Sequence, residues 1–160
     1  MKTTKSVLLI GLLASLASAG MAADSEAVKK DLAALQGEWV AVSASADGQP
    51  MPESMLKQMK RVCKGDELTV SMGEQTFFKA KVTIDPSAKP KTIDYDMTEG
   101  FSKGKKQLGI YELEGDTLKS CFGAPGAERP ADFTSNAGEK RTLSVWKRQK
   151  DAKAQVEEKR

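Results

Sequence analysis

The chain has 160 residues, of which 25 are Lys or Arg and 22 are Asp or Glu, and its formal net charge is +3. It contains no histidine, which excludes Ser-His-Asp and Cys-His catalysis and every metal centre with histidine ligands. A chain so close to neutrality has no strong electrostatic attraction for nucleic acid, and we expect no nucleic-acid partner.

The N-terminus has the pattern of a secretory signal peptide. Lys2 and Lys5 provide positive charge, residues 7–14 are apolar and uncharged, and residues 17–19 (Ala-Ser-Ala) form a cleavage signature. The apolar run is shorter than the roughly 20 residues that a bilayer-spanning helix needs, so no transmembrane anchor is expected. We predict export to the periplasm or the extracellular space.

Cleavage after Ala19, Ala22 or Ala23 leaves about 140 residues, which is enough for one domain with one core. The predicted division of the chain is a signal peptide at residues 1–22, a lipocalin-like domain at 23–148 and a charged C-terminal tail at 149–160.

The mature chain begins with a helical pattern. A helix is predicted over 24–36, with apolar residues at helical spacing on one face. Gly37 ends it, and residues 38–43 are typical of a strand. Pro52 suits the first turn of a second, short helix that runs to about Lys60. Its apolar stripe either packs on the rest of the domain or lines a binding surface. The stripe consists of Met51, Met55 and Met59.

From residue 62 onwards, apolar and polar residues alternate with the period of a strand. Together with the strand at 38–43, the pattern gives about eight short strands with tight turns, which is typical of a barrel or a sandwich. The further strands are expected at 62–64, 67–72, 77–84, 92–97, 107–114, 117–122 and 141–147.

Gly37-Glu38-Trp39, placed after a short helix and at the start of the first strand, resembles the G-x-W signature of lipocalins. In lipocalins the tryptophan closes one end of the barrel against a basic residue of the last strand, and Arg148 stands at the matching place. The resemblance implies a mainly β fold, a lipocalin-like antiparallel β-barrel of about eight strands with a short N-terminal helix. We therefore expect Trp39 to be buried with the Arg148 guanidinium near its face.

Four elements carry a more specific resemblance: Leu35-x-Gly37-x-Trp39, Asp47-Gly48, the run from Gly109-Ile110-Tyr111 through Gly115-Asp116 to Cys121, and Arg129-Pro130-x-x-Phe133. They resemble a planctomycete-type family of exported lipocalin-like domains with no established function. The resemblance covers residues 31–148 and implies the fold and the location, but it brings no catalytic residues. Within it, we expect Arg129 and Pro130 to pin the long loop 123–138 to the barrel, with Phe133 as an apolar plug.

Only two cysteines are present, Cys63 and Cys121, and their spacing matches no redox or zinc motif. A single disulfide and two separate thiols are both open from the sequence. Cys63 shares a strand face with Arg61, and Cys121 shares one with Lys119, which argues mildly against deep burial of both thiols.

Two exposed clusters have a functional and a simpler interpretation. Asp94-x-Asp96-x-x-Glu99 offers oxygen ligands for calcium, but on a strand Asp94 and Asp96 simply occupy the solvent face. The basic loop at 101–106 could touch anionic lipid or polysaccharide, or be a solvated turn.

The leading functional hypothesis is a module that binds a small apolar or amphipathic molecule inside the barrel. The alternative is a structural or protein-interaction domain whose barrel is filled with its own side chains. No enzymatic activity, cofactor or metal is expected. Few charged residues fall at inward positions, so no ionic anchor for a ligand head-group is expected. The candidate cavity residues are Trp39, Ala41, Phe78, Tyr111 and Phe122.

Overall fold

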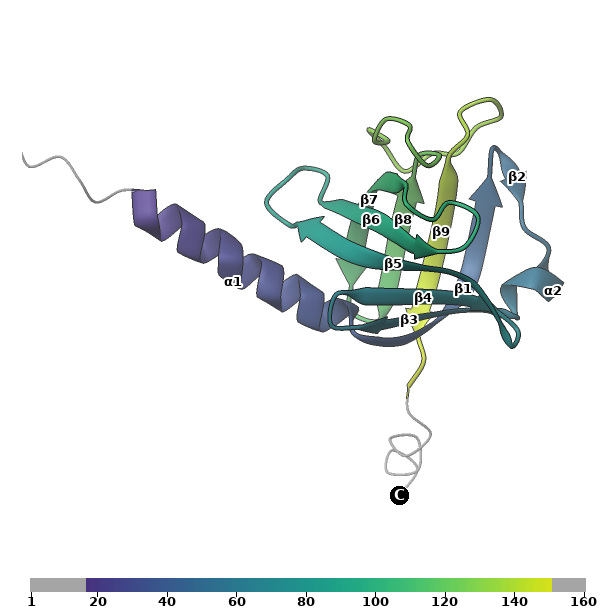
Figure 1. Cartoon of the computed structure of the whole chain (residues 1–160), viewed down its shortest axis with the longest axis horizontal. Coiled ribbons are helices and arrows are strands. Elements are labelled where there is room, and N and C mark those ends of the chain that lie inside the picture. The colour runs from purple at the N-terminus through teal and green to yellow at the C-terminus, as the bar shows by residue number, and fades with distance from the viewer. Residues whose placement is uncertain (1–16, 151–160) are drawn as a thin grey trace, which may run out of the picture.

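The computed structural model describes residues 17–150, with side chains from Ser25 onwards. One long helix precedes the strands, and one short helix lies between β2 and β3 (Figure 1). The elements are α1 (Ala17–Leu35), β1 (Gly37–Ala46), β2 (Gln49–Pro50), α2 (Glu53–Leu56), β3 (Met59–Lys64), β4 (Glu67–Met72), β5 (Gln75–Asp85), β6 (Thr92–Glu99), β7 (Lys106–Glu114), β8 (Thr117–Phe122) and β9 (Thr142–Arg148).

The strands form a closed antiparallel barrel. Each strand from β3 to β9 pairs with the one before it in the sheet, and β1 pairs with both β3 and β9, which closes the ring. The closing ladder runs from Trp39 opposite Arg148 to Ala46 opposite Thr142. The short β2 pairs only with the end of β1. The barrel therefore has eight strands, as the sequence predicted.

Alternation along the strands sets the inside and the outside of the barrel. On β6, Ile93, Tyr95 and Met97 are buried, whereas Asp96 between them is exposed. The faces predicted for this segment are therefore correct. On β3, Arg61 is buried on the inward face together with its apolar neighbours, a position that was not predicted from the sequence.

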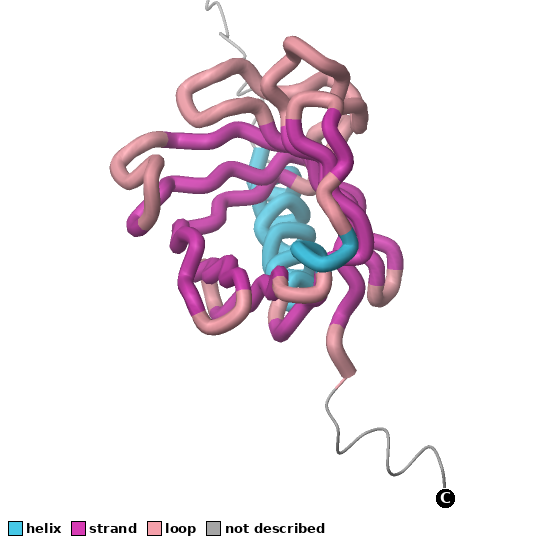
Figure 2. Tube along the Cα trace, turned by 90° about the vertical axis from the view of Figure 1, so that its right-hand side faces the viewer, coloured by secondary structure: helices cyan, strands magenta, loops and turns pink. Residues whose placement is uncertain are grey.

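Helix α1 closes one end of the barrel. Its long axis points away from the strands, and only its last turns meet them (Figures 1 and 2). Leu35 is fully buried in the core, and Gly37 takes a φ of +99°, which favours glycine and allows the chain to leave the helix for β1. Residues 17–23, which precede the predicted start at Asp24, are also helical, in line with the high helix propensity of this Ala-rich segment.

A polar cluster fastens α1 to the barrel wall. The Asp31 carboxylate accepts a hydrogen bond from the Tyr111 hydroxyl at 2.6 Å and pairs with the Lys91 ammonium at 2.7 Å. Burial raises the pKa of the Asp31 carboxyl, but the hydrogen bonds from Lys91 and Tyr111 outweigh it, so the pKa lies below its ordinary value. The Tyr111 hydroxyl on β7 therefore serves to fasten α1 to the barrel.

The predicted second helix is longer than the observed one. α2 is a single turn that ends at Leu56, because Met59 already pairs with Met72 in the ladder between β3 and β4. The methionine stripe is consequently divided. Met59 is buried on β3, Met51 is partly buried, and Met55 is exposed.

Candidate functional site

An apolar cavity of about 350 Å³ opens at the end of the barrel opposite α1. Two of its lining residues, Phe77 and Phe101, are 49% and 98% exposed, so the cavity reaches solvent beside them. The loops that join β1 to β3, β6 to β7 and β8 to β9 form this mouth. The lining comprises Ala46, Met51, Met59, Arg61, Val70, Phe77, Phe78, Tyr95, Met97, Phe101, Ser102, Gln107, Ser120, Phe122, Pro125, Thr142, Ser144 and Trp146.

The structure separates the five predicted cavity residues. Phe78 and Phe122 line the cavity, but Trp39, Ala41 and Tyr111 do not. Trp39 lies at the closed end, Tyr111 is hydrogen-bonded to α1, and Ala41 packs against the core beside an irregularity in the ladder between β1 and β9. The prediction for these three residues is wrong because depth along the barrel axis, which the sequence does not show, decides which inward side chains reach the cavity.

Arg61 is the one charged side chain among the described residues that line the cavity. It is 1% exposed and stands on β3 between Met59 and Cys63, both of which are also buried. Its Nη1 donates a hydrogen bond of 2.6 Å to the Tyr95 hydroxyl. Few inward charges were expected, and Arg61 is one of them, at a position where no ionic anchor was expected from the sequence.

The remaining polar atoms of Arg61 are unsatisfied. Nε and Nη2 are buried and have no hydrogen-bond partner within residues 25–150. Arg61 forms no ion pair with any carboxylate of this segment either. A buried charge with no counter-ion in the protein is costly, because the attraction that would offset its lost hydration is missing.

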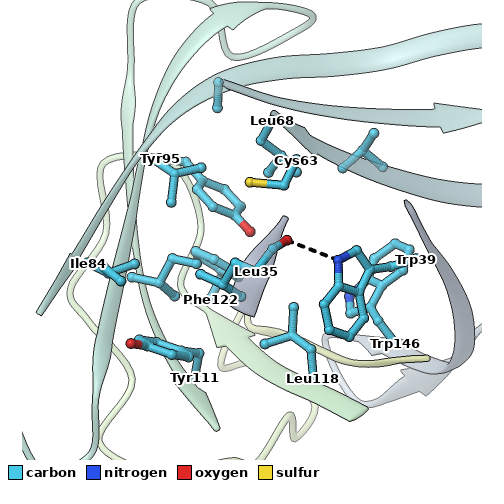
Figure 3. Close-up of a cluster of buried hydrophobic side chains, with 14 of the residues drawn as sticks. Leu35, Trp39, Cys63, Leu68, Ile84, Tyr95, Tyr111, Leu118, Phe122 and Trp146 are labelled. Carbon is cyan, nitrogen blue, oxygen red and sulfur yellow. Dashed lines mark hydrogen bonds between the residues drawn. The ribbon is translucent and has the colours of Figure 1, made fainter. Parts of the chain in front are cut away.

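Tyr95 holds the Arg61 guanidinium within an aromatic wall. Its ring stacks on Phe122 with a centroid separation of 4.3 Å, and the Arg61 Cζ lies 5.8 Å from its centroid. Figure 3 shows the Tyr95 ring among the inward side chains of the core. Burial raises the pKa of the Tyr95 hydroxyl, although the nearby Arg61 charge acts in the opposite direction. Tyr95 therefore remains neutral, and it does not neutralise the guanidinium.

Two serines add a second polar patch to the cavity wall. Ser120 and Ser144 share one hydrogen bond of 3.0 Å between their hydroxyls, and Ser144 also accepts one from the Trp146 indole N–H at 2.9 Å. The pair carries two hydroxyl protons, and its mutual hydrogen bond uses one of them. The second proton makes no hydrogen bond to another residue of the described segment, so it is available to a ligand oxygen.

The lipocalin-like signature lies at the closed end, away from the cavity. Trp39 is fully buried, and the Arg148 Cζ lies 4.2 Å from the centroid of its ring. This is the contact that the sequence predicted. The Arg148 guanidinium also donates hydrogen bonds to the carbonyl oxygens of Ala34 and Gln36, and its Nε to the Asp116 carboxylate in the Gly115-Asp116 turn. The signature residues thus join α1, β1 and β9 and have a structural role (Figure 3 draws Trp39 and its hydrogen bond to the Leu35 carbonyl).

The Arg129-Pro130-x-x-Phe133 element pins the long loop to the outside of the barrel. Arg129 pairs with both carboxylate oxygens of Asp94, at 2.5 and 3.1 Å, and donates to the Gly109 carbonyl. Pro130 is buried. Phe133 is half-buried with the Lys119 ammonium 4.7 Å from its ring centroid, so it lies on the outer face and does not plug the barrel.

The two cysteines are free thiols, which removes the disulfide that the sequence left open. Cys63 points inward with Met59 and Arg61, whereas Cys121 lies between the inward residues Ser120 and Phe122 and therefore faces outward, beneath the long loop. Both are buried, contrary to the expectation from their neighbours. Burial raises the pKa of each thiol, which disfavours the reactive thiolate.

The acidic cluster on β6 is divided among separate ion pairs. Asp94 pairs with Arg129, Asp96 with Lys106 and Glu99 with Lys79. The three carboxylates therefore do not converge on one point, and no cluster of three metal-ligating side chains occurs in the part of the chain that the structure describes.

A second hollow of about 370 Å³ lies on the outer surface, between the loop that follows β5 and the strand β7. Lys89, Glu112 and Glu114 among its lining residues are exposed, and Phe133 forms one edge. It contains no buried polar atom without a partner among the described residues. This hollow lacks the feature that distinguishes the barrel cavity.

No helix within residues 17–150 is both long enough and apolar enough to cross a membrane. Comparisons of the chain with models of protein families, with curated proteins and with solved structures found no match.

Proposed function

We propose that this protein is an exported module that holds one small apolar or amphipathic molecule inside its barrel. The observation that carries the proposal is the cavity of about 350 Å³, which is lined largely by apolar and aromatic side chains and is open at one end only. Eight strands are enough to enclose one small ligand, and the volume falls within the range of known ligand pockets.

The size of the cavity restricts the ligand. A methylene group occupies about as much volume as a water molecule in the liquid, roughly 30 Å³. A cavity of about 350 Å³ therefore accommodates roughly twelve heavy atoms, which favours a medium-length alkyl chain over a retinoid or a haem-like compound.

Export is the second part of the proposal, and its support is the sequence pattern. Lys2, Lys5 and the apolar run at 7–14 lie outside the residues that the structure describes. N-terminal sequencing of the protein from its native source is expected to begin between Gly20 and Asp24. Native protein that retains Met1 would contradict export by cleavage.

Membership of the planctomycete-type family of exported lipocalin-like domains is also a proposal. Its support is the set of contacts at the closed end, where the Arg148 guanidinium lies over the Trp39 ring and donates a hydrogen bond to the Asp116 carboxylate. The family has no established function, so this resemblance supports the fold and the location only. The class of ligand is inferred from the cavity.

The two tryptophans provide an internal test of ligand binding. Trp146 lines the cavity and Trp39 does not, so Trp39→Phe leaves a tryptophan inside the site and Trp146→Phe leaves one outside it. Titration with medium-chain fatty acids and alcohols is expected to change the emission of Trp39→Phe much more than that of Trp146→Phe. The same compounds should raise the melting temperature of the unmodified protein, because a ligand stabilises the native state by mass action.

A negative result in both measurements would contradict the binding function. If no compound changes the emission or the melting temperature at high micromolar concentration, the barrel does not act as a ligand carrier. The structural or protein-interaction role would then become the better account.

A further inference from the structure

We propose that Arg61 anchors the head-group of an anionic amphiphile, and that the ligand class is a monocarboxylate of roughly ten carbons. This inference rests on the proposed function and adds the chemistry of the ligand and its direction in the cavity. The carboxylate lies inward at Arg61 and the chain extends towards the mouth at Phe77 and Phe101.

The Arg61 guanidinium carries a charge that no counter-ion of the described residues balances. Arg61 is 1% exposed, lines the cavity and has no ion-pair partner in residues 25–150. Arginine remains protonated inside proteins. The cavity therefore contains a fixed positive charge. An anion bound there is stabilised by electrostatic attraction to the guanidinium, and a neutral molecule of the same length is not.

The geometry of the Arg61 guanidinium suits a carboxylate. Nη1 is occupied by the Tyr95 hydroxyl, whereas the two unpartnered nitrogens are Nε and Nη2. These two nitrogens share one edge of the planar group, and their N–H bonds are parallel. A carboxylate accepts two hydrogen bonds side by side from such an edge. Tyr95 thus occupies the far nitrogen and leaves the bidentate edge without a partner among the described residues.

The serine pair contributes one further hydroxyl proton to the cavity wall. Ser120 and Ser144 are both buried and both line the cavity. Their one uncommitted proton is a further donor for an oxygen-rich head-group. The buried unpartnered atoms of the cavity wall, Arg61 Nε and Nη2, are both donors, and the serine pair adds a third donor, which favours a ligand head-group that accepts hydrogen bonds.

The charge of the site favours a monoanion over a phosphate monoester. Arg61 supplies the one positive charge of the described cavity lining, and a carboxylate balances it. A phosphate monoester carries about −1.5 to −2 at neutral pH, so it would leave uncompensated negative charge inside an apolar cavity.

The test is isothermal titration calorimetry of the full mature chain with decanoate, 1-decanol and decyl phosphate at neutral pH. The unmodified protein is expected to bind decanoate at least tenfold more tightly than decanol or decyl phosphate. Arg61→Met should weaken decanoate binding roughly 10- to 100-fold, as expected for the loss of a charge-assisted hydrogen-bonded pair. It should leave decanol binding unchanged.

Two further variants separate the anchor from general effects. Arg61→Lys retains the charge but loses the bidentate edge, so its preference for decanoate over decanol should be intermediate. Arg141→Met removes an arginine that pairs with Asp132 outside the cavity, and its affinity for all three compounds should match that of the unmodified protein. Thermal unfolding of each variant verifies that it is folded.

The outcomes distinguish this inference from the proposed function. Decanoate and decanol binding with equal affinity, or Arg61→Met retaining full decanoate affinity, would overturn the anchor while the cavity remained a binding site. Tighter binding of decyl phosphate would overturn the choice of a monocarboxylate. Failure of all three compounds to bind the unmodified protein would overturn both proposals.

Discussion

Replacing Trp39 by alanine is expected to lower the free energy of unfolding by about 3–5 kcal/mol. Trp39 is fully buried at the closed end, where its ring contacts Arg148 and its indole N–H donates a hydrogen bond of 3.0 Å to the Leu35 carbonyl. The substitution therefore leaves a cavity and an unpaired carbonyl at the junction of α1 and the barrel. Urea denaturation of the unmodified protein and of Trp39→Ala measures the difference. The free energy of unfolding should fall with urea concentration at the same slope in both proteins.

The contribution of the stacked guanidinium can be separated from that of the lost volume. Arg148→Ala should cost much less than Trp39→Ala, because the arginine is partly exposed beside the Asp116 carboxylate. A double-mutant cycle of the two positions should give a coupling of about 0.5–2 kcal/mol. A loss below about 1 kcal/mol for Trp39→Ala would mean that the closed end does not depend on this residue.

Replacing Arg61 by methionine is expected to raise the free energy of unfolding by about 1–4 kcal/mol in the absence of ligand. The substitution removes a buried charge that has no counter-ion among the described residues, and methionine fills a similar space with apolar atoms. Chemical denaturation of the unliganded protein is the appropriate measurement. The gain would show that Arg61 is retained at the expense of stability, as is common for functional residues.

Tyr95 complicates that comparison and supplies its control. In Arg61→Met its hydroxyl loses the 2.6 Å hydrogen bond from Nη1, and a buried hydroxyl without a partner costs about 1–3 kcal/mol. The double variant Arg61→Met/Tyr95→Phe removes both groups and should be more stable than Arg61→Met alone. If both variants were less stable than the unmodified protein, Arg61 would be a structural residue of the barrel.

Local patterns in the sequence predicted the strands, and the resemblance to lipocalins favoured a barrel over a sandwich. The alternation over 92–97 places Tyr95 inward because one face of that strand is apolar and the other acidic, and Gly37 marks the end of the helix because its φ is positive. The contact between Trp39 and Arg148 was also predicted, from the resemblance of Gly37-Glu38-Trp39 to the lipocalin signature, and the pairing of β1 with β9 brings the two residues together. Each of these depends on a short segment or on one recognisable pairing.

The site was not predicted, because it depends on groups that are remote in sequence. A signal for Arg61 was present: Lys60 and Lys64 occupy the outward positions of β3, which places Arg61 inward with Met59 and Cys63. It was overlooked since a buried charge without a partner is rare. The shape of the cavity depends on side chains from eight strands and three loops, and no local pattern records their combined volume.

Isotope-edited NMR with ¹³C-labelled decanoate is the most direct test that the barrel cavity holds an amphiphile. The proposed site predicts nuclear Overhauser contacts from the alkyl chain to the Met59, Val70 and Met97 side chains, all of which line the cavity. Contacts to Leu113 and Phe133 in the outer hollow, with none to the three cavity residues, would contradict it.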